Sequence, residues 1–142
     1  MKANELMIGD WVQNPLGAKG WVKNIRLFPK ESDGLGGYYV IDIAYSKDGE
    51  SYARLEEIDI KPIPLTEEIL KANGFEKKGH RYGIYDDYFD FEMYEYNDGT
   101  WLVSYHCCEM SLPDEQVLIF HVHQLQHFMR HCAIDKVLKL EP

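Results

Sequence analysis

Cysteine, long apolar runs and, in the second half, basic residues are all scarce in this chain of 142 residues. Its three cysteines include an adjacent pair, Cys107 and Cys108, which is not the pattern of a disulfide framework, so we expect reduced thiols. No uncharged apolar run approaches the roughly 20 residues that span a bilayer, and the first residues lack the apolar region of a signal peptide. These absences predict a cytoplasmic protein that does not enter a membrane.

The shortage of basic residues is confined to one segment of the second half of the chain. No Lys or Arg occurs between Arg81 and Arg130, whereas nine acidic residues fall in that gap, and the whole chain has a net charge of −9. An acidic surface repels phosphate, so we expect no nucleic-acid binding through this half. Two interpretations stay open: a solvated face that keeps the protein soluble, or a docking surface for a basic partner.

Residues 1–62 contain short runs of β-forming residues separated by glycine turns. Asp48-Gly49 between two such runs is typical of a two-residue hairpin, which would place Tyr45 opposite Tyr52. A single helical turn follows before the prolines near residue 62. Short strands, tight turns and a closing helical turn within about 60 residues predict a small SH3-like β-barrel.

Residues 63–142 predict a different arrangement. A helix is expected over 66–73, because Thr66 is a favourable N-cap and an Asn-Gly pair follows the last helical position. Antiparallel strands are expected over 75–106 and a C-terminal helix over 121–133. The predicted fold is therefore α+β, an SH3-like barrel followed by an antiparallel sheet with two helices on one face, and the two parts are expected to form one compact unit.

A strand near residue 90 shows strict alternation, which separates apolar side chains from polar and tyrosine side chains on the opposite face. Asp98-Gly99 then predicts a second two-residue turn, which would place Tyr96 opposite Trp101 and Tyr94 opposite Val103. The polar face of this hairpin is the predicted interaction surface. It consists of Asp90, Glu92, Tyr94, Tyr96 and Trp101.

The C-terminal helix holds four of the six histidines. His123, His127 and His131 are spaced i, i+4, i+8, so they form a line along the helix and are weak candidates for a metal site. The helical period places the line away from the apolar side formed by Val122, Leu125, Met129 and Cys132, so we expect these histidines to face solvent or a partner.

Other features of this segment favour a structural role. Gln124 and Gln126 are not needed for the apolar stripe, and with His123 they are interpreted as polar anchors that fix the helix against the sheet. No HExxH motif, Cys-x-x-Cys pair or glycine-rich phosphate loop is present. We therefore predict no cofactor and no enzymatic activity. A metal-dependent hydrolase using His106, His121 and His123 stays as an alternative.

Three parts of the sequence resemble a group of small uncharacterised proteins of Bacteroides-type gut bacteria and their phages and mobile elements. These parts are MKANEL at residues 1–6 with IGDWV at 8–12, IPLTEE at 63–68 with Leu70 and Gly74-Phe75, and VHQLQ at 122–126. They span most of the chain in the same order as in that group. The ending departs from the pattern, since His127 stands where the group has an Asn. The resemblance implies a biological setting, because the group has no established activity.

The leading hypothesis for function is a non-enzymatic accessory protein of a phage or mobile element that binds another protein through its tyrosine-rich, acidic sheet face. An alternative from another class is nucleic-acid association through the barrel. The residues for that role would be Trp11, Lys19, Trp21, Lys23 and Arg26. A homodimer is also open, and an exposed strand edge would favour it.

Overall fold

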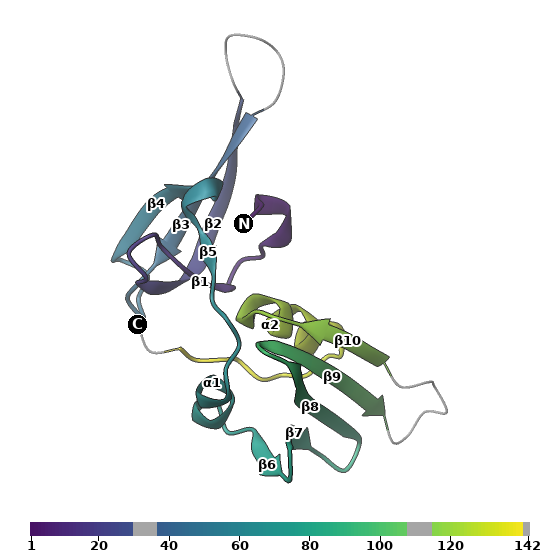
Figure 1. Ribbon diagram of the computed structural model, residues 1–142. Helices are drawn as coiled ribbons and strands as arrows, with labels where there is room; N and C mark the ends of the chain where they lie inside the picture. The colour runs from purple at the N-terminus through teal and green to yellow at the C-terminus, as the bar shows by residue number, and fades with distance from the viewer. Residues whose placement is uncertain (30–36, 108–114, 141–142) are drawn as a thin grey trace. The chain divides into compact units, whose positions relative to one another are not determined.

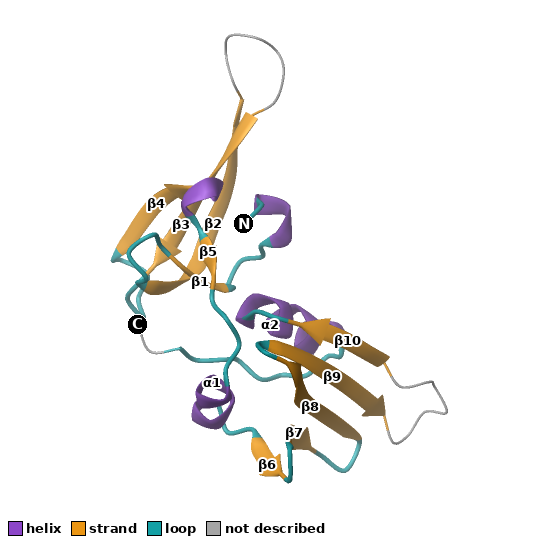
Figure 2. Cartoon of the chain, in the orientation of Figure 1, coloured by secondary structure: helices purple, strands orange, loops and turns teal. Residues whose placement is uncertain are grey.

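A computed structural model describes residues 1–29, 37–107 and 115–140 of the chain, and the described part divides into two compact units (Figure 1). The first unit comprises Met1–Ile63 with Leu140, and the second comprises Pro64–Lys139. Each contains one antiparallel sheet, and two α-helices belong to the second unit (Figure 2). The predicted α+β class is confirmed. Within the described ranges, no helix is long and apolar enough to cross a membrane.

The sheet of the first unit has the strand order β4-β3-β2-β1-β5 and does not close into a barrel within the described residues. One-turn 3₁₀-helices at Ala3–Glu5 and Glu57–Asp59 accompany it. The strands are β1 (Trp11–Gln13), β2 (Lys19–Pro29), β3 (Gly37–Ala44), β4 (Tyr52–Glu56) and β5 (Lys61–Pro62). The predicted barrel is thus observed only as an open antiparallel sheet of five strands.

The core of the first unit is centred on β3, which is buried on both faces. Its residues from Val40 to Ala44 are all buried, and four of the five are apolar. Apolar side chains from the chain start, β1, β2 and the segment before β5 complete the cluster, which contains Ala3, Leu6, Val12, Val22, Ile41, Ile43 and Ile60. Burial of this apolar surface is the main stabilising contribution to the unit.

The first hairpin differs by one residue from the predicted register. Tyr52 lies opposite Ala44, not Tyr45. The reason is a longer turn than the Asp-Gly pair suggests: the Gly49 N–H donates to the Ser46 carbonyl at 2.8 Å, and the Tyr45 N–H donates to Ser51 at 2.8 Å. The turn therefore contains Ser46 to Gly49, and the strands pair only beyond it.

The second unit is a five-stranded meander with the order β10-β9-β8-β7-β6. Its helices are α1 (Glu67–Ala72), capped by Thr66 as predicted, and α2 (Val122–His131). The strands are β6 (Glu76–Lys78), β7 (Arg81–Tyr85), β8 (Phe89–Asn97), β9 (Thr100–Cys107) and β10 (Glu115–Ile119).

Both helices of the second unit lie against one face of its sheet, which is called the core face below. The ring of Phe128 on α2 lies 5.9 Å from the ring of Phe91 on β8, and the Lys71 amine on α1 lies over the ring of Tyr82 on β7. Val122, Leu125 and Met129 of α2 are buried, as the helical period predicts.

The second hairpin also differs from the predicted register, and the cause is visible. The pairing shifts between Glu95 and Asn97, where β8 contains one residue more than β9. Trp101 therefore lies opposite Glu95, and Val103 lies opposite Met93. One inserted residue is the definition of a β-bulge, and it moves every following pair by one position.

Candidate functional site

The face of the second sheet opposite the helices, called the outer face below, carries three of the five residues predicted as an interaction surface. Asp90 is exposed, and Glu92 and Tyr94 are half-buried. Tyr96 is 59% exposed, and it is the residue that the bulge between Glu95 and Asn97 leaves unpaired. Strand alternation explains the placement, because Phe91 and Met93 of the same strand are completely buried on the core face. The alternation in the sequence was sufficient to predict which β8 residues lie outside.

The prediction that Trp101 belongs to the interaction surface is wrong. Trp101 belongs to the core face, is only 2% exposed and lies with its ring edge to face against Tyr82, the ring centroids being 6.1 Å apart. Its indole N–H donates to the Leu65 carbonyl at 3.1 Å, just before α1. The bulge at Glu95 is the physical reason, since the hairpin prediction without a bulge placed Trp101 beside Tyr96 on the outer face.

Polar contacts order one end of the outer face. The Glu92 carboxylate accepts hydrogen bonds from Arg81 at 2.8 Å and from the Tyr85 hydroxyl at 3.1 Å. The ring of Tyr85 lies over Gly83: a Cβ on Gly83 would be 2.6 Å from that ring and 2.8 Å from the Phe91 carbonyl oxygen. Gly83 is therefore required for this close approach.

The same contacts determine the protonation of Tyr85. Burial, and then the hydrogen bond to the Glu92 carboxylate, raises the pKa of Tyr85 to about 12. Both effects disfavour the phenolate, because its charge would lose hydration and repel a carboxylate. Tyr85 is therefore a hydrogen-bond donor throughout the neutral range.

The acidic side chains of the outer face gather along β8 and its two loops. Asp90 lies opposite His106 and Glu92 lies opposite Ser104. The loops at the ends of β8 add further carboxylates; these are Asp86, Asp87 and Asp98. Arg81 is bound to Glu92 and offsets the negative charge of β8 at that position.

The histidine line of α2 is not uniformly exposed. His131 is exposed as predicted, but His127 is half-buried and His123 is buried, so the prediction of a solvent-facing line is wrong at His123. The His123 ring lies between neighbouring imidazoles, 5.7 Å from His121 and 5.8 Å from His127. Burial lowers the pKa of His121, although its contact with Gln124 acts in the opposite direction.

These histidines do not converge with other ligand types. Across residues 1–29, 37–107 and 115–140, no three His, Cys, Asp or Glu side chains are grouped as a metal site. His106 lies on the outer face of β9, whereas His123 belongs to the helix on the core face. The three residues of the hydrolase alternative are therefore not brought together. Cys108 lies outside the described residues.

Of the residues predicted as polar anchors of α2, Gln124 makes hydrogen bonds to the backbone just before the helix. The Gln124 side-chain oxygen accepts hydrogen bonds from the backbone N–H groups of Phe120 at 2.9 Å and His121 at 3.1 Å. It fixes the turn between β10 and α2 in the manner of a capping residue. Gln126 is buried.

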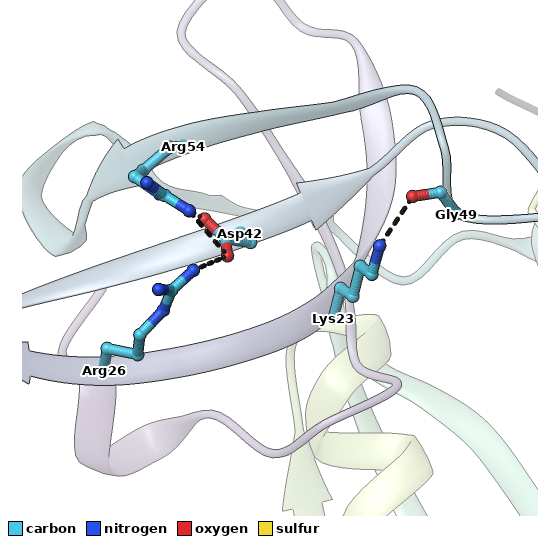
Figure 3. A network of polar contacts seen from close by, with 5 residues as sticks. All are labelled: Lys23, Arg26, Asp42, Gly49 and Arg54. Carbon is cyan, nitrogen blue, oxygen red and sulfur yellow. Dashed lines mark hydrogen bonds and ion pairs between the residues drawn. The ribbon is translucent and has the colours of Figure 1, made fainter.

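The basic residues of the nucleic-acid alternative are largely engaged within the first unit (Figure 3). Arg26 on β2 and Arg54 on β4 both donate to Asp42, which lies on β3 between them, at 2.6 and 2.8 Å. Lys23 donates to the Gly49 carbonyl at 2.8 Å. Trp11 is buried against the half-buried Trp21, with ring centroids 5.6 Å apart, and Lys19 is half-buried. Trp11 therefore offers no exposed ring, whereas Lys23 and Arg26 are exposed at the surface.

Asp42 is the buried charge of this network. The hydrogen bond from Arg54 is the strongest influence on the carboxyl and, together with that from Arg26, holds the pKa of Asp42 below its usual range despite burial. A buried carboxylate is costly unless its oxygens are paired, and here each oxygen accepts a guanidinium N–H. The three residues cross-link β2, β3 and β4.

A further surface feature was not predicted from the sequence. An open groove of about 340 Å³ is lined by Val117, Leu118, Ile119, Gln124, His127, Phe128 and His131. Three consecutive residues of a strand point to alternate faces, so a hollow that touches all three lies along the strand's edge. The only sequence signal is that residues 116–131 contain no Asp or Glu.

Comparison of the chain with protein-family models, with curated proteins and with solved structures finds no match.

Proposed function

We propose that the protein is a non-enzymatic protein-binding accessory of a phage or mobile element and that the outer face of the second sheet is its contact surface. The observation that carries this proposal is that both helices pack on the core face, whereas the outer face presents Asp90 fully and Tyr94 partly to solvent, with the exposed Tyr96 at the adjoining bulge. Tyrosine supplies large contact area with few rotatable bonds, which is why it is enriched in interfaces.

The expected partner is a basic protein surface. The carboxylates along β8 lie on a sheet face and its loops in a chain with a net charge of −9, and such a surface attracts a positively charged partner and repels nucleic acid. Arg81 offsets the charge of Glu92, so the attraction for a basic partner is assigned to the exposed Asp90 and to the carboxylates of the loops at the ends of β8.

We also propose that the first unit has an SH3-like fold. Its support is the strand order β4-β3-β2-β1-β5, the 3₁₀-turn Glu57–Asp59 between β4 and β5, and the antiparallel pairing of β5 with β1. The fold would supply a scaffold and does not itself assign a function.

The surface assignment is tested with Asp90→Lys, which reverses one exposed charge. Binding to an immobilised peptide of alternating lysine and tyrosine residues is expected to weaken about tenfold or more, because a like charge is introduced and a tenfold change needs only about 1.4 kcal/mol. Surface plasmon resonance at two salt concentrations measures the change, and affinity should also fall with salt.

Asp135→Lys is the matched control, since Asp135 is exposed and lies outside the sheet. It makes the same change in net charge. If the two variants lose affinity equally, or if the peptide fails to bind the wild-type protein, the outer face is not a surface for basic partners.

A further inference from the structure

The two edges of the second sheet differ in how they are protected. β6, at one edge, consists of Glu76, Lys77 and Lys78, all exposed. Charged side chains on an edge strand prevent another strand from adding to it. β10, at the other edge, carries charge only at its first residue, and then continues as Gln-Val-Leu-Ile. The β10 edge therefore lacks the protection that β6 has.

The edges of the first sheet are also protected. β4 contains Arg54 and Glu56, both exposed, and β5 consists of Lys61 and Pro62. A proline on an edge has no N–H to offer an incoming strand. Of the edge strands that the structure describes, β10 is thus the one whose charge is confined to its first residue and whose remaining residues are mostly apolar.

The side chains at this edge are accessible. Val117 is 36% exposed and Leu118 is 48% exposed, and both line the groove between β10 and α2. The opposite wall of the groove is formed by one stripe of α2, spaced i, i+3, i+4, i+7, which includes Phe128 and His131. An added strand would bond to the β10 edge and pack its core-face side chains against this stripe.

The charge distribution around the β10 edge favours a second copy of the chain as the binding partner. The protein has a net charge of −9, yet residues 116–131 hold no acidic residue and Arg130 is their only Lys or Arg. A strand with charged side chains gains little attraction here, because the segment offers no carboxylate and a single arginine. A second copy brings the same edge, whose charge is confined to Glu115, and pairing at β10 keeps the acidic residues of β8 two strands away from the contact in each copy.

We propose that two copies of the chain associate through their β10 strands, antiparallel, about a two-fold axis at Val117. The register follows from the length of the strand. Centred on Val117, all five residues Glu115–Ile119 pair, whereas any shift shortens the overlap. After Ile119 the strand does not extend, because the Leu65 N–H donates to the Phe120 carbonyl. The two sheets then form one continuous sheet, with both α2 helices on the same side.

The first test is sedimentation velocity on the full chain, wild type and Val117→Lys, up to roughly 1 mM, the weak end of specific association. The wild type is expected to dimerise. The substituted lysine acts as the natural edge charges do, and the dissociation constant should rise about tenfold or more. Val137→Lys is the matched control, since Val137 is 73% exposed in the same unit, and it should dimerise as the wild type does.

A second test fixes the register and does not depend on a disruptive substitution. In Val117→Cys the two introduced thiols would lie directly opposite, with Cα atoms about 4.5–5.5 Å apart, which suits a disulfide. In Leu118→Cys they would be about 8 Å apart, beyond disulfide range. Mild oxidation should therefore cross-link the first variant far more than the second or Val137→Cys, as non-reducing electrophoresis measures.

Three results would overturn the proposal. A wild-type chain that stays monomeric at every concentration would leave the groove to a segment of another protein. A dimer that Val117→Lys does not weaken relative to Val137→Lys would place the interface elsewhere. Equal cross-linking of the three cysteine variants would exclude the register. None of these depends on the outer face, which the Asp90 substitution tests separately.

Discussion

Trp101→Ala is expected to lower the free energy of unfolding by about 3–5 kcal/mol, the range for truncating a buried tryptophan. The side chain is 2% exposed, contacts Tyr82 and donates to Leu65, so its removal leaves a cavity and an unsatisfied carbonyl between β9 and the segment before α1. Urea denaturation followed by circular dichroism, with linear extrapolation, measures the loss.

Trp101→Phe separates packing from hydrogen bonding. It keeps an aromatic ring and removes the indole donor, so the expected cost is smaller, about 1–3 kcal/mol for an unpaired buried acceptor. A loss below about 0.5 kcal/mol for Trp101→Ala, the range of ordinary surface substitutions, would contradict the buried placement of Trp101.

Asp42→Asn is expected to destabilise the first unit by about 1.5–3 kcal/mol at neutral pH, the range for hydrogen bonds to charged groups. The amide is nearly the same size, but it removes the negative charge that Arg26 and Arg54 share. The side chains of Arg26 and Arg54 are 43% and 49% exposed, so water solvates them partly and the loss stays below that of a fully buried pair.

The destabilisation should depend on pH with a definite sign. The pKa of Asp42 is lower in the folded protein than the ordinary value of 3.8, so the unfolded chain binds a proton first as pH falls. The contribution of the carboxylate is complete above the ordinary value and is lost as pH falls through the folded pKa. Urea denaturation of the wild type and the variant at pH 7 and in strong acid should show their difference shrinking.

Asp135→Asn provides the control, because Asp135 is exposed and outside this network. It should change stability by less than about 0.5 kcal/mol at either pH. A difference between wild type and Asp42→Asn that is the same at both pH values would show that the loss comes from packing and not from the charge.

Local periodicity was enough to predict most elements of the second unit. Alternation along β8 placed Phe91 and Met93 inside and Asp90 outside, and the N-cap at Thr66 located the start of α1. These signals are local, because the side-chain period and the cap are set by a few neighbouring residues.

Register and burial between elements were not predictable in the same way. Both Asp-Gly pairs suggested two-residue turns, but one hairpin uses a longer turn at Ser46 to Gly49 and the other has a bulge at Glu95. Each shifts the pairing by one residue, which was enough to misplace Trp101. A bulge depends on how the whole sheet twists and packs, so the flanking residues do not encode it alone.

His123 illustrates a second limit. The helical period describes one packing face, but the first turn of α2 is also contacted by the ring of the residue that precedes the helix, His121. The groove beside β10 was missed for a related reason: a strand becomes an edge only through the order of all strands in its sheet.

The environment of Tyr85, whose ring lies over Gly83, makes its ionisation a spectroscopic probe of the pairing between β7 and β8. Of its ten tyrosines, Tyr85 has a pKa raised to about 12, so its phenol keeps its proton while an unperturbed phenol ionises near pH 10. Once β7 separates from β8, Tyr85 loses both its burial and its carboxylate neighbour and ionises with the rest. The ultraviolet absorbance of phenolate in alkaline solution therefore reports whether these two strands are still paired.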